Sequence, residues 1–354
     1  MAAAYNPDAP LLTLNDLSDA YATVQSSGLI RRTPILTDVD PQLLGLPADA
    51  DYRLHLKLEC AQLTGSFKPR GLAVQLAGLT GAGSGPKLVT MSAGNYGRSF
   101  AAVCRARRLH GLVLMPDSAP RHRVDHIRSQ GVLVETCPSS ELQSRVDAKV
   151  ANEGYQFLHP FDDQPLIAGH ASLGLELLEQ LPQVDTVLLG CGGGGLSAGV
   201  AAALALSSKS RLDEDARSAD EEPRSPVVYA VEPETACTMR LSFEQDRPAS
   251  MPQARSIAGG LAPPYAGANA YRHLRHFGAR SLLVNDAEIG ACQRRLARNL
   301  GLIVEPSACA GLAALLFDRL EEPPVGDLCV VLTGRNVSPE DAMRLLAAGD
   351  DESE

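Results

Sequence analysis

Short apolar segments alternate with helical patterns through most of this chain, and that alternation limits its fold more than any other feature. In the middle of the sequence, apolar runs and helical patterns follow one another at 87–91, 98–110, 112–115, 119–130 and 132–135. Such a series is typical of βαβ units, whose strands form a parallel sheet. It predicts one compact α/β lobe over 87–162.

A second series of this kind occupies the rest of the chain. It starts with strict polar/apolar alternation from Tyr52 to Glu59, the pattern of a half-buried strand. Further helices are expected at 165–181, 196–207, 236–245, 286–300 and 307–319, and further strands at 185–189, 227–231, 280–284 and 328–332. The predicted fold class is therefore α/β, with two lobes of open, twisted, mainly parallel sheets flanked by helices.

The smaller lobe is expected to be inserted into the larger one. Residues 1–86 and 163–354 would form the large lobe, and a glycine-rich break at 78–86 would precede the insertion. The polar stretch 207–226 is predicted to be a solvated, mobile loop, and the acidic tail 350–354 should fray. Ligands of open α/β sheets bind beyond the carboxyl ends of strands, so we expect the site in the cleft between the lobes.

Composition narrows the class of partner. Forty-two acidic residues against thirty-two basic ones give a formal net charge of -10, which works against binding to nucleic acid or an acidic membrane. A small-molecule partner is expected. The uncharged stretch 187–206 is long enough for a membrane span, but Gly192 to Gly195 would make a very poor span helix. It is interpreted as strand, glycine loop and helix.

The eight cysteines are scattered, with no Cys-x-x-Cys pair and no histidine cluster at metal spacing. They are typical of small buried side chains in a reducing compartment. The N-terminus has no basic residue before Arg31, so it lacks the character of a secretory signal or a transit peptide. A cytoplasmic location is expected.

Lys68 is the candidate nucleophile. It follows Phe67, behind a Thr-Gly-Ser turn and ahead of a helical pattern, where an amine can lose its water and form a Schiff base. This motif alone fits a solvated lysine at a helix start equally well. More distant motifs have to decide between the two.

Three such motifs follow strands. Gly192 to Gly195 lie between an apolar strand and an apolar helix, where backbone amides can surround a phosphate, although a plain flexible turn is the alternative. The loop from Ser92 to Tyr96 also opens a helix, and its amides suit a carboxylate. Thr333 ends the last apolar strand and would present a hydroxyl at the cleft; a lone threonine there is more often structural.

Taken together, these motifs resemble the pyridoxal-phosphate-dependent serine/threonine dehydratases of fold type II. The resemblance covers about residues 15 to 345. Further stretches that fit are Arg32-Thr33-Pro34, His159-Pro160-Phe161-Asp162-Asp163, Ala168-Gly169-His170, Val231-Glu232-Pro233-Glu234 and Val304-Glu305-Pro306-Ser307.

The resemblance implies pyridoxal phosphate as cofactor and assigns a role to each motif. Lys68 would form the Schiff base and then remove the substrate Cα proton, with Phe67 beside the ring. Gly192, Gly193, Gly194, Gly195 and Leu196 would hold the phosphate, Asn95 the phenolic oxygen and Thr333 the pyridine nitrogen. The residues implied at the substrate are Ser66, which would order the lysine, and Ser92, Ala93, Gly94, Asn95 and Tyr96.

Four positions depart from the family pattern. Tyr96 replaces a frequent histidine, which puts the substrate in doubt. Ala93 stands where related racemases carry the serine that serves as second acid/base, which favours elimination. Arg335 replaces a usual glycine and is interpreted as pointing outward. In the cation site of some relatives Glu232 and Ala236 fit, but Thr238 replaces an aspartate, so no essential metal is expected.

The sequence thus predicts an ammonia-lyase that converts a small β-hydroxy amino acid, such as L-threonine or L-serine, to a 2-oxo acid and ammonia. The resemblance also implies a homodimer, and the chain length leaves no room for a regulatory domain. An amino-acid racemase, a β-replacement enzyme or a hydroxyaspartate dehydratase on the same scaffold stays open. A non-catalytic cofactor-binding or amino-acid-sensing protein is the alternative from another class.

Overall fold

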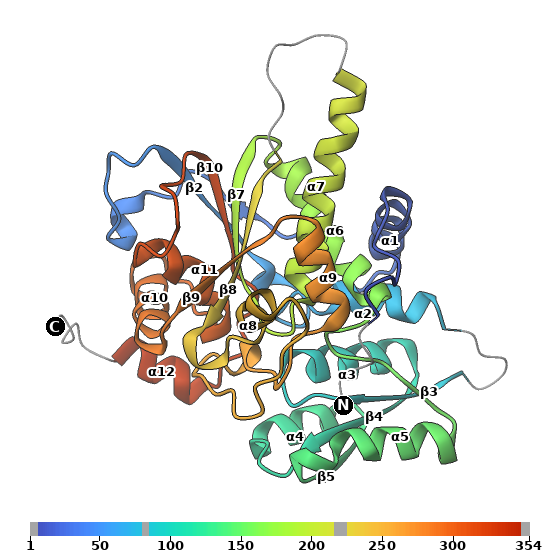
Figure 1. Cartoon of the computed structure of the whole chain (residues 1–354). Helices are drawn as coiled ribbons and strands as arrows, with labels where there is room; N and C mark the ends of the chain where they lie inside the picture. Colours follow the sequence, from blue (N-terminus) through green and yellow to red (C-terminus); the bar gives the residue numbers. More distant parts are fainter. Residues whose placement is uncertain (1–5, 80–84, 216–224, 348–354) are drawn as a thin grey trace.

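The strands form two separate sheets in the computed structural model, which describes residues 6–79, 85–215 and 225–347 (Figure 1). Neighbours in the larger sheet pair in parallel, except for its antiparallel first pair. Its strand order is β1 (Ile35–Leu36), β2 (Tyr52–Lys57), β10 (Gly326–Val331), β7 (Val184–Gly190), β8 (Val227–Pro233) and β9 (Arg280–Val284). The predicted α/β fold with mainly parallel sheets is confirmed.

The smaller sheet comes entirely from the middle of the chain. All its pairs are parallel, and its order is β5 (Leu133–Cys137), β4 (His110–Pro116), β3 (Lys87–Met91) and β6 (Tyr155–Phe157). Its connecting helices are α3 (Asn95–Arg107), α4 (Arg121–Ser129) and α5 (Leu142–Glu153). Domain boundaries at residues 86 and 163 stay a proposal.

Alternation along the central strands divides the apolar side chains between two cores. In β7, Val187 and Leu189 join one core and Leu188 joins the other. Helices that contribute to the first core include α1 (Leu14–Ser26), α2 (Pro69–Ala77), α6 (Gln164–Gln180), α7 (Gly195–Asp215) and α9 (Ala268–His276). Those of the second are α10 (Asp286–Asn299) and α11 (Pro306–Leu316), on the opposite face of the sheet (Figure 1).

The first core also reaches the smaller sheet. Leu88 of β3, Val113 of β4 and Phe100 of α3 belong to it together with Leu166 of α6. The other face of the smaller sheet packs on α5 through a small cluster around Val146. The two sheets are therefore joined by continuous apolar packing.

One predicted loop is partly wrong. Helix α7 continues to Asp215, so the first part of the expected loop 207–226 is helical. The stretch from Ser207 to Asp215 contains no glycine or proline, and its Lys, Arg, Leu and Glu are good helix formers. The apolar sequence of α7 thus ends at Leu206, but the helix continues through the mainly polar residues that follow. Residues 216–224, the tail 350–354 and part of the break at 78–86 lie outside the described residues.

Several helices were not expected from the sequence. They are α1, α5, α9 and α12 (Pro339–Ala347), and α8 begins at Thr238 after a short turn of 3-10 helix (Glu234–Ala236). Helix α5 buries only Val146, so it lacks the apolar repeat from which a helix is predicted in a sequence. Within the described part of the chain, no helix has both the length and the apolar content to cross a bilayer.

Candidate active site

One cavity of about 650 Å³ brings the predicted motifs together. Strands β2, β10 and β7 are neighbours in the larger sheet and run in parallel, so their carboxyl ends lie at the same edge. Lys68 follows β2, Thr333 follows β10, and the glycine tetrad follows β7. The loop that starts at Ser92 follows β3 of the smaller sheet and closes the cavity from that side.

All but one of the residues predicted to be catalytic or to bind cofactor or substrate line this cavity. They are Phe67, Lys68, Ser92, Ala93, Gly94, Asn95, Tyr96, Gly192, Gly193, Gly194, Gly195, Leu196 and Thr333. The exception is Ser66, expected at the substrate. It is fully buried outside the lining, and its backbone pairs with Gly334, just after β10. This pairing ties the lysine turn to the end of the neighbouring strand.

The amine of Lys68 lies in a largely apolar setting. Its Nζ donates a hydrogen bond to the carbonyl oxygen of Pro160 at 2.9 Å and lies 4.9 Å from the centroid of the Phe67 ring. Burial lowers the pKa of Lys68 to about 8, although Glu305 opposes the shift. A larger fraction of the amine is thus neutral near physiological pH, as a nucleophile or base requires.

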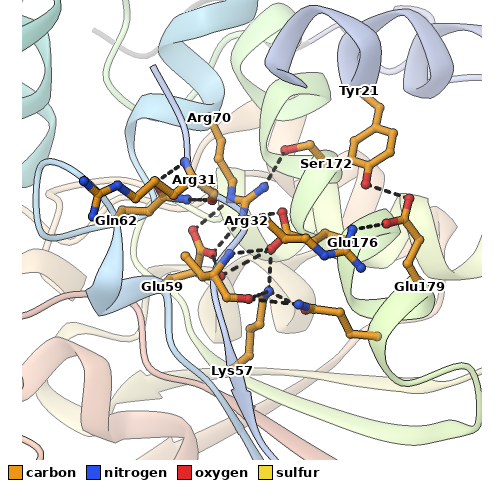
Figure 2. A network of polar contacts seen from close by, with 12 residues as sticks. Tyr21, Arg31, Arg32, Lys57, Glu59, Gln62, Arg70, Ser172, Glu176 and Glu179 are labelled. Atoms are coloured by element: carbon orange, nitrogen blue, oxygen red, sulfur yellow. Dashed lines mark hydrogen bonds and ion pairs between the residues drawn. The ribbon is translucent and has the colours of Figure 1, made fainter. Parts of the chain in front are cut away.

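Two residues after Lys68, Arg70 holds the start of α2 in a buried ionic network (Figure 2). Its guanidinium donates to both carboxylate oxygens of Glu59 at 2.8 Å and to Glu176 of α6 at 2.9 Å. Lys57 of β2 donates to the other oxygen of Glu176 at 2.5 Å. The network therefore connects β2, α2 and α6 directly behind the lysine turn.

The four ions of this network balance in charge. None of the four side chains is more than 5% exposed. Burial opposes the charge on Arg70, but Glu59 and Glu176 outweigh it and raise the Arg70 pKa. Burial likewise opposes the charge on Glu176, but Arg70 and Lys57 hold its pKa below the ordinary value. Loss of any member would leave an unpaired buried charge.

The glycine tetrad is required by close packing. A Cβ at Gly193 would overlap the Phe161 ring, and one at Gly195 would overlap the Phe161 carbonyl oxygen. Gly194 has a φ of +90°, which side chains rarely adopt. The first amides of α7 have no partner within the helix, and these residues line the cavity, so the loop fits a phosphate group.

Two partners fix the side-chain amide of Asn95. Its Nδ2 donates to Glu305 at 2.5 Å, and its Oδ1 accepts from Nδ2 of Asn336 at 2.6 Å. One of the two hydrogens on Nδ2 is then left for a group in the cavity. Burial raises the pKa of Glu305 to about 7, although Asn95 and Arg123 favour its anion.

Tyr96 lines the cavity, but its hydroxyl is bound to another side chain. The Oη donates to Oε1 of Gln75 at 2.6 Å, and Tyr96 is only 2% exposed. Burial raises the pKa of this phenol well above its ordinary value. Its hydroxyl is thus a poor proton donor for a ligand, and the residue acts on the cavity through the shape of its ring.

The other departures from the family pattern have clear positions. Ala93 lines the cavity with a methyl group, which cannot exchange a proton. Arg335 is exposed and is not among the lining residues, in agreement with its outward interpretation. Arg123 does line the cavity, and its Nη1 reaches the Ala93 carbonyl oxygen at 3.4 Å.

At the candidate cation site, backbone amides already bind the carboxylate of Glu232. Glu232 accepts from the amides of Met239 and Arg240 at 2.8 and 2.7 Å, at the start of α8. Ala236 and Thr238 are buried beside this turn. Among the residues with described positions, no three acidic, cysteine or histidine side chains gather as a metal site would require.

Comparison with known proteins identifies the family. The family model described as "Pyridoxal-phosphate dependent enzyme" matches residues 27–334. This chain belongs to the pyridoxal-phosphate-dependent enzymes. Within that family it is an enzyme of the serine/threonine dehydratase-like group with fold type II, and pyridoxal phosphate is its cofactor.

Three relatives illustrate the range of this pyridoxal-phosphate-dependent group. A phenylserine dehydratase from Ralstonia pickettii is 32% identical, over 95% of this chain and 98% of its own. A serine racemase from Rattus norvegicus is 29% identical over 92% of this chain and 93% of its own. The solved structure of a threonine deaminase from T.th. has a TM-score of 0.79 at 29% identity and covers 92% of this chain and 99% of its own.

Several lining residues were missed by sequence reasoning. Glu305, Arg123 and Tyr265 line the cavity but were not among the predicted site residues. Glu305 lies in a stretch that fits the family pattern, which was a usable signal. Its contact with Asn95 spans 210 positions, however, and no local pattern reports such a pairing.

Proposed function

We propose that this enzyme is an ammonia-lyase that dehydrates a small β-hydroxy amino acid, with L-threonine and L-serine as the first candidates. The observation that carries the proposal is the amine of Lys68. It is desolvated, lines the cavity together with the glycine tetrad, and has a pKa lowered to about 8. The relatives named as dehydratases and a threonine deaminase support the same class of reaction.

The lining residues fit the cofactor. The glycine tetrad and Leu196 would hold its phosphate, the free hydrogen on Nδ2 of Asn95 would bind its phenolic oxygen, and Thr333 would face its ring nitrogen. When bound, pyridoxal phosphate supplies an aldehyde carbon for amines and a conjugated ring that delocalises the electron pair of a broken Cα–H bond. A neutral hydroxyl at the ring nitrogen does not stabilise a protonated ring, which favours prompt loss of a β-leaving group.

Lys68 would carry out the proton transfer. Its amine would hold the cofactor covalently, become free when the substrate amine takes its place, and then accept the Cα proton of the substrate. Loss of the β-hydroxyl as water and hydrolysis of the resulting enamine release a 2-oxo acid and ammonia. Because one water leaves and one enters, the net reaction consumes no water.

Elimination is favoured over racemisation by the groups near Lys68. Racemisation needs a proton donor on each face of the carbanion. Ala93 has only a methyl group, and the Tyr96 hydroxyl is directed at Gln75. A racemase is the second candidate, because the serine racemase from Rattus norvegicus is similar over nearly the whole chain.

Turnover by the purified enzyme tests the proposal. Wild type and Lys68→Ala are incubated with L-threonine, L-serine, phenylserine and 3-hydroxyaspartate, and 2-oxo acid and ammonia are measured. Wild type should produce both from at least one of these substrates, and Lys68→Ala should produce neither. Full activity in Lys68→Ala would refute the role of the lysine.

Two further outcomes separate the alternatives. A D-enantiomer without 2-oxo acid, seen by chiral chromatography, would favour the racemase. Cofactor binding with no turnover of any substrate would favour a non-catalytic sensor. Arg123 in the cavity wall is the reason for including the dicarboxylate 3-hydroxyaspartate.

The assembly, location and metal requirement complete the proposal. The resemblance supports a homodimer, which light scattering tests. The expected reducing compartment supports a location in the cytoplasm. No essential divalent metal is proposed, because backbone amides already contact the Glu232 carboxylate. Loss of activity with a chelator, restored by magnesium, would contradict this.

A further inference from the structure

The tautomer of His159 is determined by its backbone contacts. Its Nδ1 accepts from the amide of Asp162 at 2.9 Å and from the amide of Phe161 at 3.3 Å. A nitrogen that accepts from N–H groups carries no hydrogen of its own. The proton of the neutral ring therefore sits on Nε2.

The ring is neutral over the whole range in which the enzyme would work. Burial, reinforced by the nearby Lys68, lowers the pKa of His159 to about 4. The adjacent carbonyl of Pro160 is the one that accepts from Lys68. The segment 159–162 thus contacts the candidate catalytic amine and also fixes the direction of the histidine ring.

The Nε2–H of His159 reaches the hydroxyl of Tyr265 at 3.2 Å. Since the nitrogen is the donor, the phenol oxygen is the acceptor, and the phenol hydrogen is left for another group. Within the described ranges, His159 is the one hydrogen-bond partner of this hydroxyl. Burial also raises the pKa of Tyr265, so the phenol keeps its hydrogen at neutral pH.

Tyr265 lines the cavity beside the glycine tetrad. Its ring lies 5.2 Å from that of Phe161, centroid to centroid, and the Phe161 ring occupies the space that a Cβ at Gly193 would need. The Tyr265 ring thus lies one ring away from the loop expected to hold the phosphate, and Tyr265 lines the same cavity as Lys68. Tyr265 was not among the residues predicted to bind the phosphate or the substrate.

We propose that Tyr265 is a ligand-binding residue that donates a hydrogen bond to an anionic oxygen in the cavity, with His159 as the positioning residue that directs it. Both the cofactor phosphate and the substrate carboxylate carry such an oxygen. Only for the substrate carboxylate does the inference rest on the proposed function. An anion gains more from a hydrogen bond than a neutral acceptor does, so the phenol contributes to affinity rather than to shape alone.

Tyr265→Phe removes the hydroxyl and keeps the ring. Tyr155→Phe is the matched control, because the Tyr155 hydroxyl also contacts a histidine, Nε2 of His110 at 3.1 Å, but lies outside the cavity. In the first arm, the apoprotein is titrated with pyridoxal phosphate and with pyridoxal. In the second arm, the holoenzyme is titrated with L-serine and L-threonine, and binding is followed by the cofactor absorbance.

The expected loss in Tyr265→Phe is about 10- to 150-fold in one dissociation constant, which corresponds to the roughly 1.5–3 kcal/mol that hydrogen bonds to charged groups contribute. A loss for pyridoxal phosphate but not pyridoxal identifies the phosphate. A loss confined to the amino acids identifies the substrate carboxylate. Tyr155→Phe should change neither. If Tyr265→Phe behaves like Tyr155→Phe in both arms, the inference is wrong.

His159→Asn tests the positioning role. The asparagine Oδ1 can still accept the two backbone amides in place of Nδ1, while the Nε2–H donor is lost. If His159 acts through Tyr265, its substitution should weaken binding in the wild-type background and have no further effect in Tyr265→Phe. Fully additive losses would overturn that role. The cofactor arm measures binding without turnover. A protein that binds cofactor but converts no substrate would therefore refute the proposed function and leave the test of Tyr265 at the phosphate intact.

Discussion

At the residue scale, the cavity holds two groups whose charged forms are disfavoured by burial. The pKa of Lys68 is lowered to about 8 and that of Glu305 is raised to about 7. Glu305 favours the charged form of Lys68, and Asn95 and Arg123 favour that of Glu305, but burial has the larger effect on both. Near neutral pH, Lys68 is therefore better able to act as a base, and Glu305 changes its charge within the working range.

Glu305→Gln tests the raised pKa in the apoprotein. In wild type, the folded state holds the Glu305 proton up to about pH 7, whereas the unfolded chain releases it near 4.5. The contribution of Glu305 to stability is therefore fully present below pH 4.5 and is lost as pH rises to 7, by up to about 1.4 kcal/mol per pH unit. Glu305→Gln should lack this slope in urea unfolding from pH 5 to 8. Parallel curves for the two proteins would contradict the shift.

Sequence and structure contributed differently at this scale. Lys68 was predicted because its Thr-Gly-Ser turn and the glycine tetrad form local patterns with chemical meaning. The direction of the Tyr96 hydroxyl was not, because it depends on Gln75 of α2 across the core. The same holds for Ser66, whose place was decided by its backbone pairing with Gly334.

At the element scale, the start of α2 is held by charge and the start of α7 by close packing. Arg70→Met would leave Glu59 and Glu176 with one cation fewer in a buried site. We expect a loss of about 3–5 kcal/mol in the free energy of unfolding and weaker cofactor binding, because the lysine turn is no longer tied to α6. Denaturant unfolding and cofactor titration measure the two effects.

Arg32→Met is the matched control for the network. Arg32 pairs with Glu179, but its side chain is 52% exposed. Exposed pairs contribute about 0–1 kcal/mol, so this variant should remain close to wild type. Equal losses in the two variants would show that the buried network has no special part in holding α2.

Gly193→Ala tests the packing of the glycine tetrad. Its new Cβ would overlap the Phe161 ring, so the loop or the ring must move. Gly259→Ala is the control, because Gly259 also lines the cavity but a Cβ there meets no atom within 4 Å. Titration of the apoproteins should show at least about tenfold weaker pyridoxal phosphate binding for Gly193→Ala only. Equal affinities would mean that the loop does not hold the phosphate.

Elements with a repeating apolar pattern were predicted well, and the others were not. Strands β3, β7 and β9 lie within one residue of their predicted ranges. Helix α7 extends beyond its apolar face. Helix α9 was not predicted, because arginines and histidines make up most of the segment from Tyr271 to His276. Tertiary contacts stabilise such helices without a strong local signal.

At the scale of the whole molecule, strand order decides the site. Strand β10, near the end of the chain, lies between β2 and β7, and this places Thr333 between Lys68 and the glycine tetrad. Periodicity indicated parallel sheets, but it contains no information about which strands pair. The resemblance, not the periodicity, was what placed these motifs in one site.

The shared apolar core predicts that the two sheets unfold together. Phe100→Ala removes a buried ring from that core and should cost about 3–5 kcal/mol. Hydrogen exchange should then increase in β4 and in β7 by similar free energies. Val146→Ala, in the separate cluster beneath α5, should affect the smaller sheet more. An effect of Phe100→Ala confined to residues 87–157 would contradict coupled unfolding.

The most direct test of the account is to locate the lysine that binds the cofactor. The chain has five lysines, at positions 57, 68, 87, 149 and 209. The holoenzyme is reduced with borohydride, which makes the bond between lysine and cofactor permanent, and the peptides are mapped by mass spectrometry. We predict the pyridoxyl label on Lys68 and on no other lysine. A stoichiometric label on another lysine, or none on Lys68 in cofactor-saturated enzyme, would contradict it.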